Sequence, residues 1–183
     1  MSFIQTIKSY NPTFWVANFL QIIERGAWFG VFSLLGLYLV ASTDEGGLGL
    51  SHIQKGNILA NVTAIQFFLP LFFGVIADRI GYKLSLIIAF VIIGVGYYLM
   101  GTVDSYWAIY LAFLFAAMGG SFFKPVASGI IARTTDEKTS TMGFGLFYLM
   151  ANIGGFFGPA FSSYLRTTMG WRIIFLQGAA MSF

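Results

Sequence analysis

The stretch Asn18 to Phe32, NFLQIIERGAWFGVF, places two opposite charges, Glu24 and Arg25, inside an apolar run that extends from about residue 15 to residue 40. A helix of that length can cross the hydrocarbon core of a bilayer. The polar residues of the stretch recur at helical spacing with two aromatic residues, so all six share one face: Asn18, Gln21, Glu24, Arg25, Trp28 and Phe32. An ionised side chain at mid-membrane costs about 2.5 to 3.5 kcal/mol on insertion scales, so we expect this face to contact protein or water rather than lipid.

The composition of the whole chain is that of a polytopic membrane protein. Of its 183 residues, 57% are hydrophobic and only 9% are charged, whereas soluble domains carry about a quarter charged residues. The net charge of +3 is scattered, with no basic run of the kind that binds nucleic acid. The chain lacks cysteine and has one histidine, His52, beside a polar loop, so we expect neither a metal site nor a cofactor.

Apolar runs and polar turns predict an all-α bundle with six helices, at about 14–40, 52–77, 83–100, 107–131, 142–164 and 171–183. Residues 1–13 read as an amphipathic lead-in at the membrane interface. The turn at 78–82 is so short that the helices on either side must be antiparallel neighbours. The last apolar run is only about 20 Å long as a helix, too short for a bilayer, so we expect the sixth helix to be incomplete.

Positive charges are distributed unevenly between the two predicted ends of the bundle. One end carries Lys8, Arg79, Lys83, Arg133 and Lys138, and the other carries Lys55, Arg166 and Arg172. The positive-inside rule then predicts that the N-terminus lies in the cytoplasm. We expect the chain to be a multi-pass protein of a bacterial inner membrane.

The loop after the second predicted helix reads Gly74-Val-Ile-Ala-Asp78-Arg79-Ile-Gly81-Tyr-Lys83. It resembles the G-x-x-x-D-R-x-G-x-K signature of the major facilitator superfamily at every defined position. Asp78 and Arg79 can pair with each other or with helix ends, and Gly81 has the backbone freedom that a very short turn needs. The alternative is a plain cytoplasmic turn with positive-inside charges.

The fourth predicted helix contains Phe122-Phe-Lys124-Pro125. An unpaired ammonium group in an apolar run is costly, so Lys124 needs water or a carboxylate, and Glu24 is the nearest candidate. Pro125 cannot donate to the helix ladder and is expected to bend the span. Alternatively, Lys124 extends toward the membrane interface.

The fifth predicted helix contains Phe147-Tyr148-Leu-Met-Ala-Asn152-Ile-Gly154 and continues to Gly158. Gly154 and Gly158 form a G-x-x-x-G face for close helix packing, and Asn152 is expected to be a buried polar group. Packing alone explains the glycines, and it leaves Tyr148 and Asn152 as candidate ligands.

Together these segments resemble the N-terminal half of the proton-dependent oligopeptide transporter family. Its patterns are E-x-x-E-R-F-x-x-Y in the first helix, F-x-K-P in the fourth and F-Y-x-x-x-N-x-G in the fifth. In the first helix Gln21 replaces the first glutamate, Gly26 the phenylalanine and Phe29 the tyrosine. Phe32 stands where the family commonly has an arginine for the peptide carboxylate, and Phe67 where a tyrosine is usual.

The resemblance implies a secondary active transporter that works by alternating access, coupled to protons through Glu24, Arg25 and Lys124. Ionised Glu24 would pair with Arg25 or Lys124, and its protonation would release that pair and shift the balance between inward-open and outward-open states. The implied substrate-binding residues are Gln21, Trp28, Phe29, Phe32, Phe67, Tyr148 and Asn152. The implied conformational gate is Gly74, Asp78, Arg79, Gly81 and Lys83. Because the first-helix residues are aromatic rather than charged, we expect a less charged or aromatic solute.

Two other functions fit parts of the sequence. A facilitator or drug-type exporter of the same superfamily would lack proton symport, and a non-transporting membrane subunit would use the polar residues for assembly. An enzyme is not expected, because no Ser-His pair or metal motif accompanies Glu24 and Lys124. The expected partners are a small solute, protons, lipid and the C-terminal half that completes about twelve helices.

Overall fold

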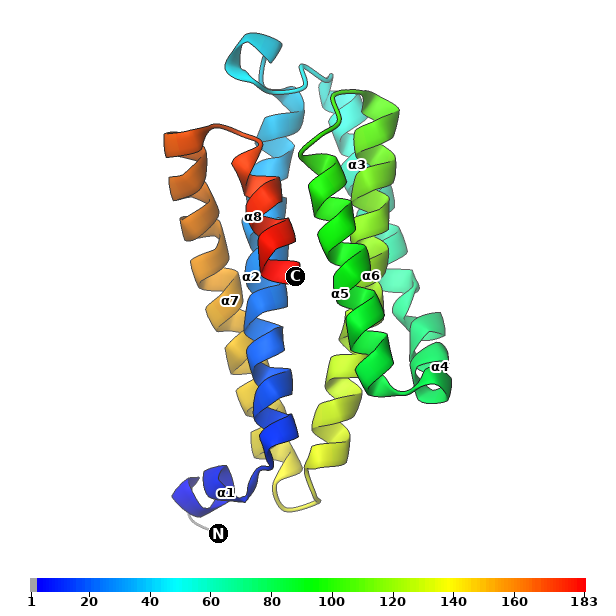
Figure 1. Cartoon of the computed structure of the whole chain (residues 1–183), viewed down its shortest axis with the longest axis vertical. Helices are drawn as coiled ribbons and strands as arrows, with labels where there is room; N and C mark the ends of the chain where they lie inside the picture. The colour runs from blue at the N-terminus through cyan, green and yellow to red at the C-terminus, as the bar shows by residue number, and fades with distance from the viewer. Residues whose placement is uncertain (1–2) are drawn as a thin grey trace.

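The computed structural model describes residues 3–183, and in that range every regular element is a helix, which confirms the predicted all-α class. Figure 1 shows the helices as a long bundle with most axes nearly parallel. The elements are α1 (Phe3–Ser9), α2 (Pro12–Val40), the 3₁₀ turn η1 (Thr43–Glu45), α3 (His52–Phe68), α4 (Pro70–Ile80), α5 (Tyr82–Met100), α6 (Tyr106–Thr134), α7 (Ser140–Met169) and α8 (Ile173–Ser182).

Local sequence explains where the helices begin and turn. Asn11 caps α2 by accepting a hydrogen bond from the Phe14 amide, and Pro12 follows the cap in the first turn. Ser51 and Gln54 form a reciprocal capping box at the start of α3. A single residue, Gly81, joins α4 to α5 with φ of 87°, a conformation that side chains with a Cβ rarely adopt.

One predicted helix, 52–77, is wrong as a single straight span. The helix is interrupted at Leu69, and the axes of α3 and α4 meet at a bend of 45°. Pro70 begins α4 and cannot donate the hydrogen bond that would continue α3. By contrast, α6 passes through Pro125 as one helix. Within the described residues, four helices (α2, α5, α6 and α7) are long and apolar enough to cross a membrane, and α3 with α4 makes a fifth span if counted together.

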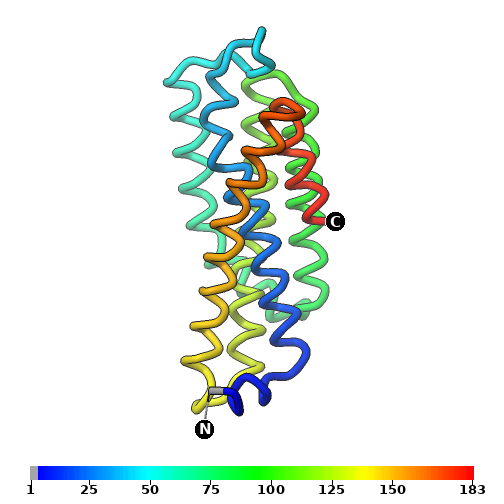
Figure 2. Tube along the Cα trace, turned by 90° about the vertical axis from the view of Figure 1, so that its left-hand side faces the viewer, coloured from blue at the N-terminus to red at the C-terminus, as the bar shows by residue number. Residues whose placement is uncertain are grey.

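The bundle has two main helix pairs, α2 with α7 and α5 with α6. The short α8 packs against α5 and α2, while α3 and α4 cover α6 (Figures 1 and 2). The α2–α7 contact is made backbone to backbone. A Cβ at Gly154 would meet the Ile22 carbonyl oxygen, and a Cβ at Gly158 would meet the Gly26 carbonyl oxygen. The glycine face predicted on the fifth helix therefore has a matching glycine on α2.

The two ends of the bundle carry the charges that the sequence separated. Figure 1 shows α1, the α4–α5 turn and the α6–α7 loop toward one end, with the α2–α3 and α7–α8 connections at the other. The first end carries Lys8, Arg79, Lys83, Arg133 and Lys138, and the second carries Lys55, Arg166 and Arg172.

Candidate functional site

Glu24 and Arg25 form an ion pair inside the bundle. The Arg25 Nε atom donates to Glu24 Oε2, and Nη2 donates to Oε1 at 2.6 Å, so the carboxylate is held by both oxygens. The side chains are 2% and 12% exposed, respectively. Because both side chains are buried, removal of either one would leave the other charge poorly solvated and without a partner.

Lys124 lies near this pair but does not bind Glu24 directly. Within residues 3–183 its ammonium group has no carboxylate within ion-pair distance, and instead lies 4.9 Å from the centre of the Phe67 ring. Of the two expected ion-pair partners of Glu24, the structure thus has Arg25 and not Lys124, since Arg25 already occupies both carboxylate oxygens. A cation over a ring face is stabilised by the quadrupole of the ring.

A cavity of about 550 Å³ lies between α2, α4, α6 and α7. The predicted site residues that line it are Gln21, Arg25, Phe29, Lys124, Tyr148 and Asn152. Glu24 lies behind the wall, bound to Arg25. Sequence reasoning missed Pro70 and Ser128, which also line the cavity, although a proline in an apolar run was a visible signal for a helix break at this depth.

Three predicted residues have other environments. Trp28 and Phe32 stack on each other and on Phe113, so they form the packing between α2 and α6 rather than the cavity wall. Asn152 was expected to be buried but is exposed on the open side of α7. Gly154 and Gly158 of α7 lie against the α2 backbone, whereas Asn152 lines the cavity.

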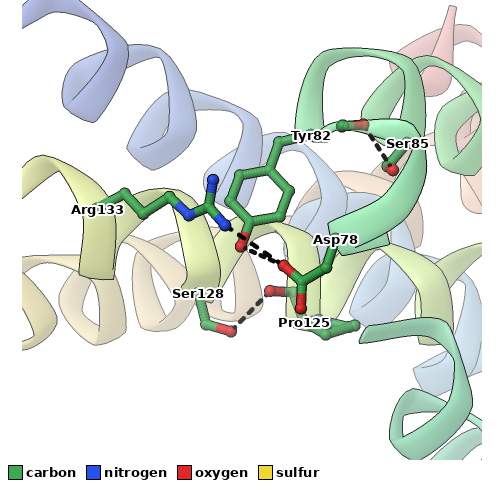
Figure 3. Close-up of polar contacts among 7 residues, drawn as sticks. Asp78, Tyr82, Ser85, Pro125, Ser128 and Arg133 are labelled. Atoms are coloured by element: carbon green, nitrogen blue, oxygen red, sulfur yellow. Dashed lines mark hydrogen bonds and ion pairs between the residues drawn. The ribbon is translucent and has the colours of Figure 1, made fainter. Parts of the chain in front are cut away.

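The predicted gate forms a small polar cluster where α4, α5 and α6 meet (Figure 3). Asp78 accepts a hydrogen bond from the Tyr82 hydroxyl at 3.0 Å and pairs with Arg133 at 3.5 Å. The Arg133 guanidinium also lies 4.5 Å from the centre of the Tyr82 ring. Asp78 thus binds Arg133 and not its neighbour Arg79, because the α4–α5 turn points the carboxylate toward α6.

Most of this cluster is open to solvent. The side chains of Arg133 and Asp78 are 68% and 60% exposed, and an exposed ion pair contributes about 1 kcal/mol or less. Gly74 packs close to Pro125, where a Cβ would lie 3.6 Å from the proline ring. Gly74 and Gly81 position the cluster, while Arg79 and Lys83 are exposed. The contact is weak enough to break and re-form without unfolding the bundle.

Known transporters resemble this chain in sequence. The Major Facilitator Superfamily model matches residues 15–183. A peptide transporter, YePEPT, of Yersinia enterocolitica is 27% identical over 83% of this chain and 31% of the relative. A Na(+), Li(+), K(+)/H(+) antiporter of Planococcus maritimus is 30% identical over 87% of this chain and 37% of the relative. The chain thus spans about a third of the length of these relatives, which are transporters and not enzymes.

A solved structure of a POT family transporter in complex with 5-aminolevulinic acid has the same fold over this region. It superposes with a TM-score of 0.86 and covers 97% of this chain and 39% of its own, at 22% identity. The predicted resemblance to peptide transporters is therefore confirmed among both relatives and structures. From the match to residues 15–183 and from the fold, the chain belongs to the Major Facilitator Superfamily.

Proposed function

We propose that this chain is the N-terminal part of a proton-coupled symporter for small organic solutes or peptides. The observation that carries the proposal is the buried Glu24–Arg25 pair at the wall of a cavity whose other cation, Lys124, has no carboxylate partner. Glu24 is the proton carrier, and Arg25 and Lys124 are the cations that respond to its charge.

Charge balance provides the coupling. Glu24, Arg25 and Lys124 together carry one net positive charge, which rises to two when Glu24 takes up a proton. A proton on Glu24 therefore frees Arg25 and makes the cavity more favourable for an anionic group of a solute. The solute in turn favours the protonated state, because linkage between two ligands is reciprocal.

The remaining wall sets the solute class. Phe29, Phe147 and Tyr148 contribute aromatic surface to the cavity, and Gln21 and Asn152 contribute neutral polar groups. Such a wall suits a solute with an apolar or aromatic part that is oriented by a few hydrogen bonds. Because Trp28, Phe32 and Phe67 do not line the cavity, we restrict the proposed binding residues to the other four predicted ones.

A second candidate is exchange of alkali cations for protons, favoured by the antiporter relative at 30% identity. The cavity argues against it. A bare cation needs oxygen ligands and negative charge, but the carboxylate of Glu24 is engaged by Arg25, and both lining side chains with a charge are cations.

The Asp78 cluster, with Gly74, Arg79, Gly81 and Lys83, is the proposed gate at the cytoplasmic end. With this assignment the chain lies in a bacterial inner membrane with its N-terminus on the cytoplasmic side. A C-terminal half of the transporter would close the cavity. This chain has no cysteine, so once any cysteines in the rest of the complete gene product are replaced by serine, single cysteines at Glu137 and Glu45 can be labelled selectively. An impermeant thiol reagent applied outside intact cells should label position 45 and not position 137, and the reverse result would invert the topology.

Transport by the complete gene product in proteoliposomes tests the proposed function. Di- and tripeptides, neutral aromatic solutes and Na⁺ are supplied with and without an inward proton gradient. Accumulation of an organic solute that depends on the gradient is expected, and Glu24→Gln should abolish accumulation while sparing exchange. Glu45→Gln, in the loop after α2, is the control. Accumulation by Glu24→Gln would refute the mechanism, and proton-driven Na⁺ movement alone would select the second candidate.

A further inference from the structure

Gln66 is a buried polar residue on α3 that the sequence motifs do not include. It lies three residues before the break at Leu69 and is 2% exposed. Its main-chain carbonyl accepts a hydrogen bond from the Ser121 hydroxyl at 3.1 Å, which ties this part of α3 to α6. Its side-chain Nε2 atom, however, has no hydrogen-bond partner among the described residues.

The unpartnered amide faces the same small space as Glu24. A Cβ added to Gly120 of α6 would lie 3.4 Å from Glu24 Oε1 and 3.5 Å from Gln66 Nε2. Both atoms therefore border the surface of Gly120, but no hydrogen bond joins them. The space beside the glycine is what separates the amide from the carboxylate.

A buried amide nitrogen without a partner is destabilising, so its retention here needs an explanation. In this conformation Arg25 binds both oxygens of the carboxylate. A protonated Glu24 is neutral and would no longer attract the guanidinium. The neutral carboxyl then needs a neutral partner, and a primary amide can donate to its carbonyl oxygen.

We propose that Gln66 is the partner that protonated Glu24 takes when Arg25 is released, with its Nε2 donating to the carboxyl carbonyl across the space kept open by Gly120. Gln66 is thus a positioning residue that stabilises the protonated state. The inference rests on the proposed role of Glu24 as proton carrier and adds the hydrogen-bond partner of the protonated carboxyl group.

The two cations near Glu24 do not take this role. The charged and titratable side chains around it are Arg25 on α2, Tyr97 on α5 and Lys124 on α6, with Tyr148 of α7 at the cavity wall. Both cations favour the ionised form of Glu24 and oppose its protonation. From α3 the neighbouring group is the neutral amide of Gln66.

Infrared difference spectroscopy of the complete gene product in lipid nanodiscs tests the proposal without any solute. Protonation of Glu24 gives a carboxyl C=O band whose amplitude is followed against pH, and loss of the band in Glu24→Gln identifies it. In Gln66→Met, which keeps the length but cannot donate, the band should move to higher wavenumber. The titration midpoint should fall by about 0.5 to 1 pH unit, the effect of one neutral hydrogen bond on the protonated form.

Two further variants keep the test decisive. Gly120→Ala fills the space at ordinary contact distances and should fold, so it should shift band and midpoint in the same direction as Gln66→Met. Gln54→Met, in the first turn of the same helix, should change neither. A Glu24 band that titrates but is unaffected by both Gln66→Met and Gly120→Ala would overturn the role of Gln66 and leave proton coupling standing. Absence of any titrating Glu24 band would overturn both.

Discussion

Replacing Arg25 by methionine should destabilise the protein far more than the loss of one hydrogen bond. The substitution keeps an unbranched apolar side chain but leaves the Glu24 carboxylate, 2% exposed, without its bidentate partner. Breaking a buried pair from one side costs about 3 to 5 kcal/mol. The ammonium of Lys124 offsets part of this loss, so we expect about 3 kcal/mol.

The double variant Glu24→Gln with Arg25→Met isolates the pair. Because it removes both charges together, it should be more stable than the sum of the single variants predicts, by about 2 to 3 kcal/mol of coupling. Unfolding of the complete gene product in mixed micelles, followed by tryptophan fluorescence, measures each free energy.

The ion pair of Arg172 with Asp104 serves as the matched control. Its side chains are 59% and 65% exposed, so the corresponding cycle with Arg172→Met and Asp104→Asn should give a coupling of about 1 kcal/mol or less. Equal coupling energies at the two sites, or less than about 0.5 kcal/mol at the buried pair, would refute the reasoning that burial makes the Glu24–Arg25 pair strong.

Three further outcomes are expected. Gly158→Val should prevent normal folding because its side chain meets the backbone of α2, whereas Gly145→Val, with open space around it, should give a monodisperse protein; size-exclusion chromatography compares the two. Phe113→Ala removes a fully buried ring from the stack on α2 and should cost about 3 to 5 kcal/mol in the same unfolding assay. Hydrogen bonds from the side-chain hydroxyl and the amide of Thr139 lower the pKa of Asp136, so their stabilisation of this turn is present above the usual carboxyl pKa and is lost as pH falls through the lowered one. In Thr139→Val the pKa of Asp136, measured by NMR, should rise toward its ordinary value; an unchanged pKa would contradict this assignment.

The helical class and the polar face of the first span could be predicted because both depend on short-range sequence. Long apolar runs with few charges allow only helices in a bilayer when the backbone must satisfy its own hydrogen bonds. The three-residue step from Gln21 to Glu24 placed these side chains on one face, and the structure has both buried on α2. The close glycine contact of α7 was also predictable, although its partner Gly26 was not.

Pairings between helices could not be obtained in the same way. Periodicity puts Trp28 and Phe32 on the same face as Glu24, but that face is wide enough to border both the cavity and the Phe113 side of α6. For Asp78 the sequence left two kinds of partner open, its neighbour Arg79 or a helix end, and the structure has Arg133 in the last turn of α6, 55 residues away.

The sequence by itself determined that this is a helical membrane protein of the Major Facilitator Superfamily, with charges inside its first span. Only the tertiary structure decided that Arg25 rather than Lys124 neutralises Glu24, that Lys124 faces Phe67, and that Gln66 lies unpartnered beside them. The physical reason is that helical spacing dictates which side chains share a face, whereas the neighbour of that face depends on the rotation and approach of a second helix. Here that approach is governed by Gly119, Gly154 and the helix break at Leu69, through contacts that act across the bundle rather than along the chain.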